Sequence, residues 1–243
     1  GWWENDNTNP FMTAYVVYGM SLAKQAGYEI TQGSLNKGIA SIKEQLKRSD
    51  LDPTTRAYML YSLATAEEKN RDYFDKEISK ISSSDINDYA RSLIAMTWKL
   101  IGNDGKANES LSILEKNAKT SGEGAAYWEG KQFHYQWQND KVQTTAMALK
   151  AIVNINESSQ LKDKVIRWLM MQRQGTAWRN TQETAMIVYA MVDYLKTSNE
   201  LEPNYSVKVI VNGQNVFEKQ MSKEDVFRKS EIIKVNAEIL KTG

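Results

Sequence analysis

The segment AYMLYSLA, residues 57–64, is one of five gapless copies of an eight-residue pattern, and this repetition decides the fold. The other copies are AYVVYGMS at 14–21, ARSLIAMT at 90–97, AMALKAIV at 146–153 and AMIVYAMV at 185–192. Each copy begins with alanine, has an aliphatic residue three places later and a small residue five places later. Such helices are apolar around most of their circumference, and the small residues let neighbouring helices approach closely, so the copies predict five buried helices.

Segments with a narrower apolar stripe lie between these copies. The stripe is found at Leu35, Ile39, Ile42 and Leu46, at Phe74, Ile78 and Ile81, at Ala107, Leu111, Leu114 and Ala118, and at Leu161, Val165, Trp168 and Gln172. Lys, Glu, Ser and Asn fill the other positions, which predicts helices with one face in water. Buried helices that alternate with amphipathic helices indicate stacked helical hairpins.

Helix ends are marked by capping residues, proline and glycine. Asn9-Pro10 and Asp52-Pro53 are typical of a capped helix with proline in its first turn. Gly27, Gly102 and Gly105 are expected at helix ends.

The pattern changes after about residue 201. YSVKVIV, residues 205–211, alternates between apolar and polar residues, and Asn212-Gly213 favours a type I′ turn, so residues 205–219 predict a β-hairpin. Residues 230–240 predict one more strand. Because three strands make a marginal sheet, we expect a helical domain at 1–201 and part of a truncated β-domain at 202–243.

Composition excludes several classes of site and partner. The 243 residues carry 31 Lys and Arg against 30 Asp and Glu, and no block of like charge stands out, which argues against nucleic acid as a partner. The absence of cysteine excludes disulfides, thiolate zinc sites and a cysteine nucleophile within these residues. We find no membrane-spanning run and no signal peptide. The chain begins without methionine and in mid-motif, so we expect an excised fragment.

The first candidate site is GWWENDNTN at the start of the chain. Glu4 and Asp6 supply two carboxylates, as glycoside hydrolysis requires, and the oxygen side chains are also compatible with calcium. A structural loop that ends in the Asn9 cap is favoured over a ligand loop and over a metal site.

The second candidate site is the aromatic stretch at 122–140, which has little helical period and is expected to form an inserted loop or hairpin. It contains Trp128, Glu129, the single histidine His134, Tyr135, Trp137 and Asp140. Aromatic rings beside carboxylates can stack on sugars, but aromatic residues in a long loop more often fix it to the core. A lone histidine is a poor start for a metal site, so we expect a loop residue.

The third candidate site is QRQGTAWRNTQETA, residues 172–185. It is expected to form a turn into the fifth buried helix, with Thr181 as the cap and Glu183 near the positive helix end. A structural role is favoured here. The sequence shows no Gly-rich phosphate loop, GxSxG elbow or HExxH motif, so the residues alone favour a protein that is not an enzyme.

These repeats and motifs together resemble a known family. The succession GWW…TAY, RAYMLYSLA, YARSLIAM, AAYWE…TTAMALKA, IRWLMMQR and NTQETAMIVYAM is similar to the thioester domain of the alpha-2-macroglobulin and complement family, most closely its bacterial members. The resemblance covers about residues 1–200, and its most specific parts are 126–129, 168–173 and 181–185. The family usually has serine where this chain has Asn180, and glycines where it has Thr176-Ala177.

The resemblance implies a mainly α fold, an α/α toroid of alternating inner and outer helices with an incomplete ring, followed by a small β segment of a neighbouring β-domain. It implies a non-catalytic scaffold and interface domain of a bacterial, broad-spectrum protease-trapping inhibitor with a role in host defence. In the family, cleavage of a bait region exposes a Cys-Gln thioester that acylates nearby nucleophiles. Because this chain has no cysteine, the thioester lies upstream of Gly1 or is absent.

The resemblance also implies partners and a location. We expect proteases, bound through the full-length protein, and neighbouring β-domains of the same chain, with no cofactor and no metal. The expected location is the periplasm, the cell envelope or the outside of the cell. The candidates for shielding a thioester or forming an interface are Trp2, Trp3, Glu4, Asp6, Tyr15, Trp128, Tyr135, Trp137, Trp178 and Gln182.

Two further expectations remain open. A carbohydrate-active lyase or hydrolase also fits an α/α toroid, and it requires Glu4, Asp6, Glu129 or Asp140 to converge in one cleft. An incomplete ring predicts exposed apolar surface and dimerisation of the isolated chain.

Overall fold

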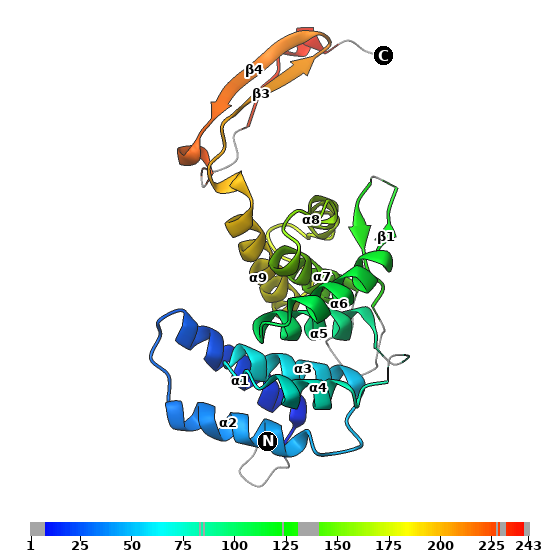
Figure 1. The fold of residues 1–243 in the computed structure, drawn as a ribbon. Helices are drawn as coiled ribbons and strands as arrows, with labels where there is room; N and C mark the ends of the chain where they lie inside the picture. The colour runs from blue at the N-terminus through cyan, green and yellow to red at the C-terminus, as the bar shows by residue number, and fades with distance from the viewer. Residues whose placement is uncertain are drawn as a thin grey trace. The chain divides into compact units, whose positions relative to one another are not determined.

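The computed structural model describes residues 8–82, 84, 86–122, 124–130, 141–226, 228 and 232–240. The chain forms two compact units, residues 1–193 and 194–243. The first unit is helical and the second contains a β-hairpin (Figure 1). The domain boundary expected between residues 201 and 202 stays a prediction.

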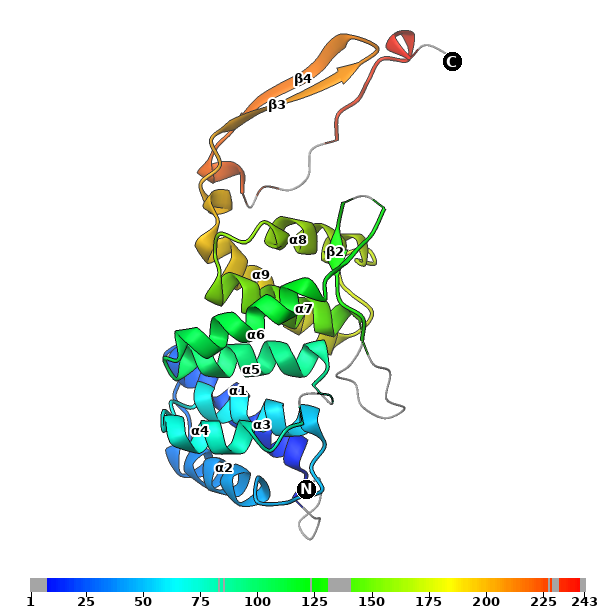
Figure 2. The same ribbon diagram turned by 45° about the vertical axis from the view of Figure 1, so that its right-hand side comes forward.

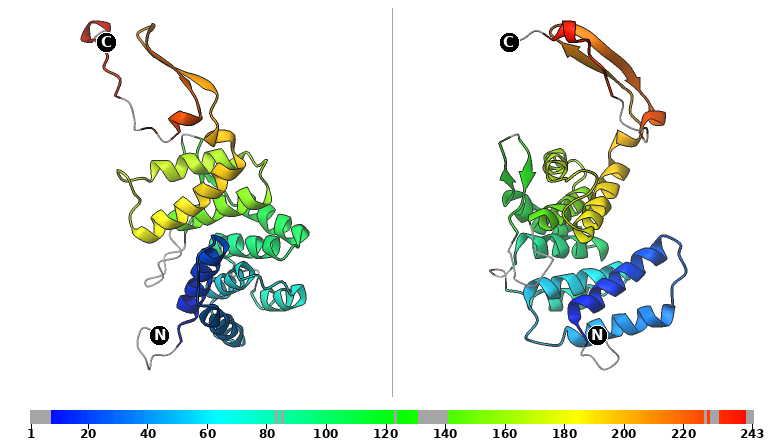
Figure 3. Two further views of the ribbon diagram at one scale, coloured as in Figure 1. Left: turned by 90° about the vertical axis from the view of Figure 1, so that its left-hand side faces the viewer. Right: turned by 180° about the vertical axis from the view of Figure 1, so that it is seen from behind.

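Helices that alternate between an inner and an outer layer build the first unit (Figures 1 and 2). The inner helices are α1 (Pro10–Gln25), α3 (Pro53–Thr65), α5 (Asp88–Leu100), α7 (Lys141–Ile155) and α9 (Thr181–Thr197), and the outer helices are α2 (Gln32–Gln45), α4 (Arg71–Ile78), α6 (Asp104–Lys116) and α8 (Leu161–Met171). Along the inner layer α1 packs on α3, α3 on α5 and α5 on α7 (Figure 3). The predicted mainly α fold class with alternating helices is confirmed.

Burial of the inner helices differs along the layer. Every residue of α3 from Thr54 to Thr65 is buried, and α5 and α7 are buried over most of their length. The prediction of five buried helices is wrong for α1 and α9, where Tyr15 and Tyr189 are half exposed. Within the described residues α3 and α5 each pack extensively on two inner helices, whereas α1 packs extensively on one inner helix, α3.

The outer helices have the predicted single apolar face. Leu35, Ile42, Leu46, Phe74, Ile81, Ala107, Leu111, Leu114, Val165 and Trp168 are all buried. The lysines and glutamates between them lie mostly towards solvent. The narrow stripes therefore predicted the outer layer correctly.

Hydroxyl groups buried in the inner helices bond within their own helix. Ser62 Oγ donates to the carbonyl of Tyr58 at 2.8 Å, and Thr97 Oγ1 donates to the carbonyl of Leu93 at 2.8 Å. The same bond to the fourth preceding carbonyl is made by Ser21, Thr65 and Ser92. The hydroxyl groups of these small polar residues therefore keep a hydrogen-bond partner although they are buried in the inner layer.

The inner helices α1, α3 and α5 begin at side-chain caps. The N–H of Met12 donates to Asn9 Oδ1 at 3.0 Å, and equivalent bonds to Asp52 and Asn87 cap α3 and α5. Both caps that precede a proline were predicted correctly.

Glycine ends two helices as predicted. Gly27 and Gly102 follow α1 and α5 with φ of 84° and 76°, a conformation that glycine adopts without steric cost. The prediction for Gly105 is wrong, because this residue lies in the first turn of α6, whose cap is Asn103.

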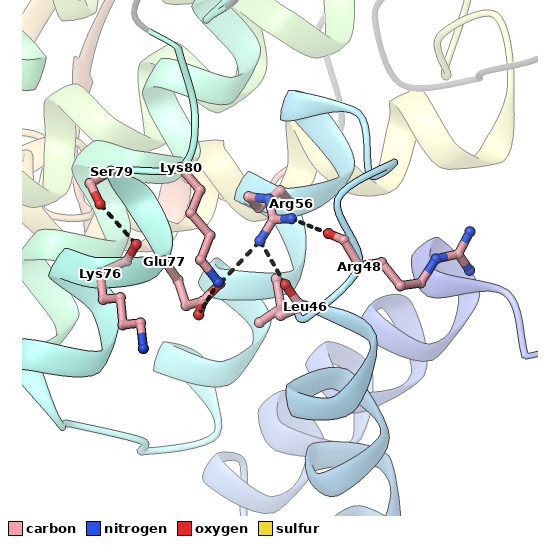
Figure 4. A network of polar contacts seen from close by, with 7 residues as sticks. All are labelled: Leu46, Arg48, Arg56, Lys76, Glu77, Ser79 and Lys80. Carbon is pink, nitrogen blue, oxygen red and sulfur yellow. Dashed lines mark hydrogen bonds and ion pairs between the residues drawn. The ribbon is translucent and has the colours of Figure 1, made fainter.

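A buried arginine joins the first two helical hairpins (Figure 4). Arg56 on α3 donates to Glu77 Oε2 on α4 at 3.0 Å and to the carbonyls of Leu46 and Arg48 after α2 at 2.9 and 2.6 Å. Lys80 adds a second ion pair to Glu77 at 2.6 Å. The side chains of Arg56 and Glu77 are only 6% and 7% exposed, so removing either one would leave the other as a buried charge with fewer partners.

A short hairpin encloses the start of the insertion predicted at 122–140. β1 (Lys119–Thr120) pairs antiparallel with β2 (Ala126–Tyr127). Residues 131–140, the rest of the insertion, lie outside the described residues.

The second unit contains the predicted hairpin of β3 (Tyr205–Val211) and β4 (Gln214–Met221), together with short 3₁₀ turns at Asn199–Leu201, Lys223–Asp225 and Ala237–Ile239. Asn212 and Gly213 both have positive φ, 49° and 84°, which confirms the type I′ turn.

The third predicted strand is wrong over the described residues 232–240. They contain the last 3₁₀ turn and no strand pairing. An alternating sequence forms a strand only where the edge of another strand supplies hydrogen-bond partners. Here the carbonyl of Ile239 accepts a hydrogen bond from a side chain, Asn212 Nδ2, at 2.6 Å.

Candidate functional site

An aromatic cluster joins α1 to α3. The rings of Phe11 and Tyr58 stack with their centroids 5.1 Å apart, and the ring of Tyr18 lies 5.4 Å from Tyr61 and 6.2 Å from Tyr58. Tyr15, a predicted interface residue, lies 6.3 Å from Phe11 and is 52% exposed. Tyr15 is therefore the solvent-facing edge of a cluster that is otherwise mostly buried.

Burial raises the pKa values of three tyrosine hydroxyls in this cluster. It raises the pKa of Tyr18 to about 12 and the pKa values of Tyr58 and Tyr61 well above 10. The pKa of Tyr89 on α5 is raised for the same reason. At neutral pH these groups are hydrogen-bonding phenols rather than phenolate nucleophiles.

Polar side chains connect α7 to α9. Lys150 forms an ion pair with Asp193, and Asn154 Nδ2 donates to Asp193 Oδ2 at 3.0 Å. The charge of Asp193 also contributes to the raised pKa values of Tyr18 and Tyr61. Residues from α1, α3, α7 and α9 therefore share one electrostatic environment on the inner layer.

Trp128 lies in the core. Its side chain is fully buried, its indole N–H donates to the carbonyl of Leu114 at 2.7 Å, and its backbone N–H donates to Thr145 Oγ1 at 3.1 Å. These bonds tie the segment after β2 to the end of α6 and the start of α7. Trp128 thus packs the inserted segment onto the helices, and its ring is not available at a surface.

The residues on either side of Trp128 form a ladder of stacked groups. The ring of Tyr127 stacks on Trp168 of α8 with the centroids 5.1 Å apart, and Lys141 Nζ lies 4.8 Å from the centroid of the Tyr127 ring. Lys141 also pairs with Glu129 at 3.2 Å. Glu129, a carboxylate that the enzyme hypothesis requires, is therefore engaged by a lysine.

The turn at 172–185 is closed by backbone pairing. Gln174 and Ala177 pair across the turn, with Gly175 at φ 63°. The indole N–H of Trp178 donates to the carbonyl of Leu169 at 2.8 Å, which fastens the turn to α8.

The cap of α9 is Asn180 and not Thr181, so this prediction is corrected. Asn180 Oδ1 accepts from the N–H of Glu183 at 2.8 Å, and Asn180 Nδ2 donates to the Glu183 carboxylate at 3.1 Å. Glu183 is buried near the positive helix end, as predicted, and pairs with Arg179 at 2.5 Å. The predicted cap lay one residue late because asparagine and threonine are both good caps.

Many predicted site residues lie outside the described residues. They are Trp2, Trp3, Glu4, Asp6, His134, Tyr135, Trp137 and Asp140. The backbone of Gln182 lies in the first turn of α9, and its side chain is also outside the described part of the chain. Tyr15, Trp128 and Trp178 lie on three different elements, and of these Trp128 is fully buried in the core. The roles of these residues as a shield or an interface stay predictions.

The aromatic cluster was not predicted, although the sequence carries a signal for it. Tyr15 and Tyr58 occupy the second position of the eight-residue pattern, and Tyr18 and Tyr61 occupy the fifth. Residues three apart share one side of a helix, so tyrosine at both positions of two adjacent inner helices indicates a shared aromatic face.

Metal ligands and membrane spans are both missing from the described part of the molecule. Within the described ranges, no group of three or more His, Cys, Asp and Glu side chains is placed to hold a metal ion. Of the helices in the described part of the chain, none combines the length and apolar character needed to cross a bilayer.

Comparison with known proteins relates the chain to one family. Residues 73–194 match the family described as the A-macroglobulin TED domain. The chain is also 21% identical over 226 residues to Alpha-2-macroglobulin of Thermotoga maritima. This alignment covers 92% of the chain and 12% of the relative, so the chain spans a small part of that protein's length. The matched range 73–194 includes both the Trp128 segment and the turn before α9.

Proposed function

The chain belongs to the A-macroglobulin TED domain family, and from this premise we propose that it is a non-catalytic scaffold and interface domain of a bacterial protease-trapping inhibitor. Trapping is a property of a longer protein, since the chain corresponds to 12% of its alpha-2-macroglobulin relative. We place that protein in the periplasm, in the cell envelope or outside the cell, and we assign it a role in defence against foreign proteases.

One observation carries the scaffold and interface role. The inner layer is packed through α3, α5 and α7, while α1 presents Tyr15 and Val16 to solvent, each 52% exposed. Apolar side chains exposed in this way, on a helix that is otherwise packed, are typical of a contact surface. Glu129, one of the carboxylates that the carbohydrate-active alternative requires, is paired with Lys141.

The interface proposal extends to the chain start. Trp2 and Trp3 precede α1, and with Tyr15 they form our candidate shield for a thioester elsewhere in the longer protein. Aromatic packing protects a reactive acyl group by excluding water from it. In a longer protein that contains a Cys-Gln pair, these three residues are therefore expected to control access to the thioester.

The trapping proposal is tested with the longer protein. After incubation with a protease, we expect cleavage of a small peptide substrate to persist while cleavage of a large protein substrate is lost. Unhindered cleavage of both substrates, or hydrolysis of polysaccharides by the longer protein, would contradict the proposal.

The shielding proposal has its own test. Replacing Trp2 and Trp3 with alanine, or Tyr15→Ala, is expected to increase methylamine incorporation into the intact longer protein. Tyr28→Ala is the matched control, because Tyr28 is also an exposed tyrosine, at 71%, and lies beyond the end of α1. Equal incorporation in all variants would remove the shielding role and leave the trapping proposal standing.

A further inference from the structure

We propose that Arg56 protects the loop after α2 from trypsin-like proteases, because it holds the carbonyl group that such a protease must attack. The protection itself follows from the contacts of the loop. Its use, which is survival of the domain beside a captured and still active protease, rests on the proposed trapping function.

The loop after α2 carries the sequence that a trypsin-like protease recognises. Lys47 and Arg48 are adjacent, and residues 47–50 are all exposed. A protease of this class selects lysine or arginine through its specificity pocket and attacks the carbonyl carbon of that residue, whose oxygen enters the oxyanion hole. By sequence and exposure alone, the bond between Arg48 and Ser49 is therefore an accessible cleavage site.

The carbonyl group of this bond is already engaged in the structure (Figure 4). Arg56 Nη2 donates to the carbonyl oxygen of Arg48 at 2.6 Å, and Arg56 Nη1 donates to the carbonyl oxygen of Leu46 at 2.9 Å. Glu77 Oε2 accepts from Arg56 Nη1 at 3.0 Å, and the Arg56 side chain is only 6% exposed. The carbonyl oxygen of Arg48 can therefore enter an oxyanion hole only after a buried charged donor has lost this partner.

The side chain and the backbone N–H of Arg48 are engaged as well. Arg48 Nε and Nη2 donate to the two carboxylate oxygens of Asp50 at 2.9 and 2.7 Å. The N–H of Arg48 donates to the carbonyl of Gln45 at 3.0 Å. Proteolysis of a folded chain requires local opening, so each bond slows cleavage by lowering the population of the open loop. The exposed pair with Asp50 contributes little, which leaves Arg56 as the main source of protection.

Moving the cleavable residue within the loop tests the proposal without changing Arg56. In the described part of the chain, no hydrogen bond reaches the carbonyl oxygen of Asp50, which is also exposed. The double variant Arg48→Gln with Asp50→Arg places the cleavable residue there, and aspartate follows two residues later in both chains, at Asp50 or Asp52. We expect trypsin to cut the variant after position 50 about tenfold or more faster than it cuts the unmodified chain after Arg48.

Removing the donor is the second test. Arg56→Met is expected to raise the rate of cleavage after Arg48 about tenfold or more. Because this variant also destabilises the domain, its control is Leu111→Ala, which creates a cavity under the outer helix α6 at a residue that is 2% exposed. The two variants are compared at urea concentrations that give them the same free energy of unfolding, where global unfolding alone would cut both at the same rate.

Mass spectrometry of the fragments identifies each bond that is cut and counts cleavage after Lys47 separately. The proposal would be overturned by equal rates after position 50 and after Arg48, or by equal rates in Arg56→Met and Leu111→Ala at matched stability. Trypsin is the probe and the 243-residue chain is the substrate, so neither result depends on trapping. Confirmed protection in this chain, together with a longer protein that does not trap proteases, would contradict the proposed function and leave the role of Arg56 standing.

Discussion

Asn180 holds the first turn of α9 through two hydrogen bonds to Glu183. The family that this chain resembles usually has serine at this position. The same geometry explains both residues, because serine and asparagine are both preferred helix caps. We expect Asn180→Ser to leave the stability of the first unit nearly unchanged. Asn180→Ala is expected to lower the free energy of unfolding by about 0.5–2 kcal/mol, measured by urea denaturation. Equal stability of the two variants would contradict the capping role.

Arg56 provides a second prediction at the scale of a residue. Arg56→Met leaves Glu77 with Lys80 alone and leaves two carbonyls without a donor, so we expect the free energy of unfolding to fall by about 3–5 kcal/mol. Glu44→Gln is the matched control, because its ion pair with Lys47 has both side chains 72% exposed. Its expected effect is below about 1 kcal/mol in the same urea experiment. Comparable losses in both variants would show that burial does not determine the strength of the pair.

At the scale of the helix, two glycines distinguish an exposed position of α1 from the packed contact between α1 and α2. A Cβ added to Gly38 on α2 lies 2.6 Å from Cγ2 of the buried residue Val17, whereas a Cβ added to Gly19 on α1 meets nothing within 4 Å. We expect Gly19→Ala to raise the free energy of unfolding by about 0.5–1 kcal/mol through higher helix propensity. Gly38→Ala is expected to lower it by about 1–3 kcal/mol through overpacking. Thermal and urea unfolding check both, and a stabilising Gly38→Ala would show that α1 and α2 can separate without cost.

At the scale of the helix, the type of each helix could be predicted from the sequence, but the exposure of α1 and α9 could not. The type of each helix followed from its own residues, because an all-round apolar pattern and a narrow stripe are local properties. The exposure of α1 and α9 did not follow, since their patterns match those of α3 and α7 and exposure depends on tertiary packing, which a single-helix pattern does not contain. Trp128 was ambiguous for a related reason, because its indole partner, the carbonyl of Leu114, is set by the packing of α6 against the inserted segment.

At the scale of the whole molecule, alkaline pH is expected to destabilise the first unit. Burial raises the pKa values of Tyr18, Tyr58 and Tyr61 above the unfolded value of about 10. The unfolded chain therefore releases these protons first, so stability is intact below about pH 10 and falls as the pH rises further. Urea midpoints across this range, with phenolate absorbance as the second signal, test the expectation.

The control for alkaline unfolding is Tyr61→Phe. This variant removes one buried titrating hydroxyl and is expected to weaken the fall in stability above about pH 10. A midpoint that does not change with pH would mean that the aromatic cluster titrates equally in the folded and unfolded chain.

Family and architecture could be predicted for the whole molecule, while the site could be predicted only in part. Repetition across 14–192 predicted the alternating layers, and Asn212-Gly213 predicted the hairpin turn. The third strand at 230–240 was wrong over its described residues, because strand pairing depends on an edge elsewhere. The tyrosine cluster was missed because contact between α1 and α3 is a tertiary property that single-helix patterns do not show.

The hydroxyl bonds inside the inner helices have a consequence for passage through a membrane. Ser62, Thr65 and Thr97 cost little in the folded unit, because each bonds to a carbonyl one turn earlier. A stop-transfer sequence requires about 20 predominantly apolar residues. Each inner helix is shorter than that, and several contain hydroxyl side chains, so each inner segment is a poor stop-transfer sequence when the unfolded chain crosses a lipid bilayer. Helices that are buried in the folded unit, such as α3 and α5, can therefore be encoded by segments that are too short and too polar to stop in a bilayer during export.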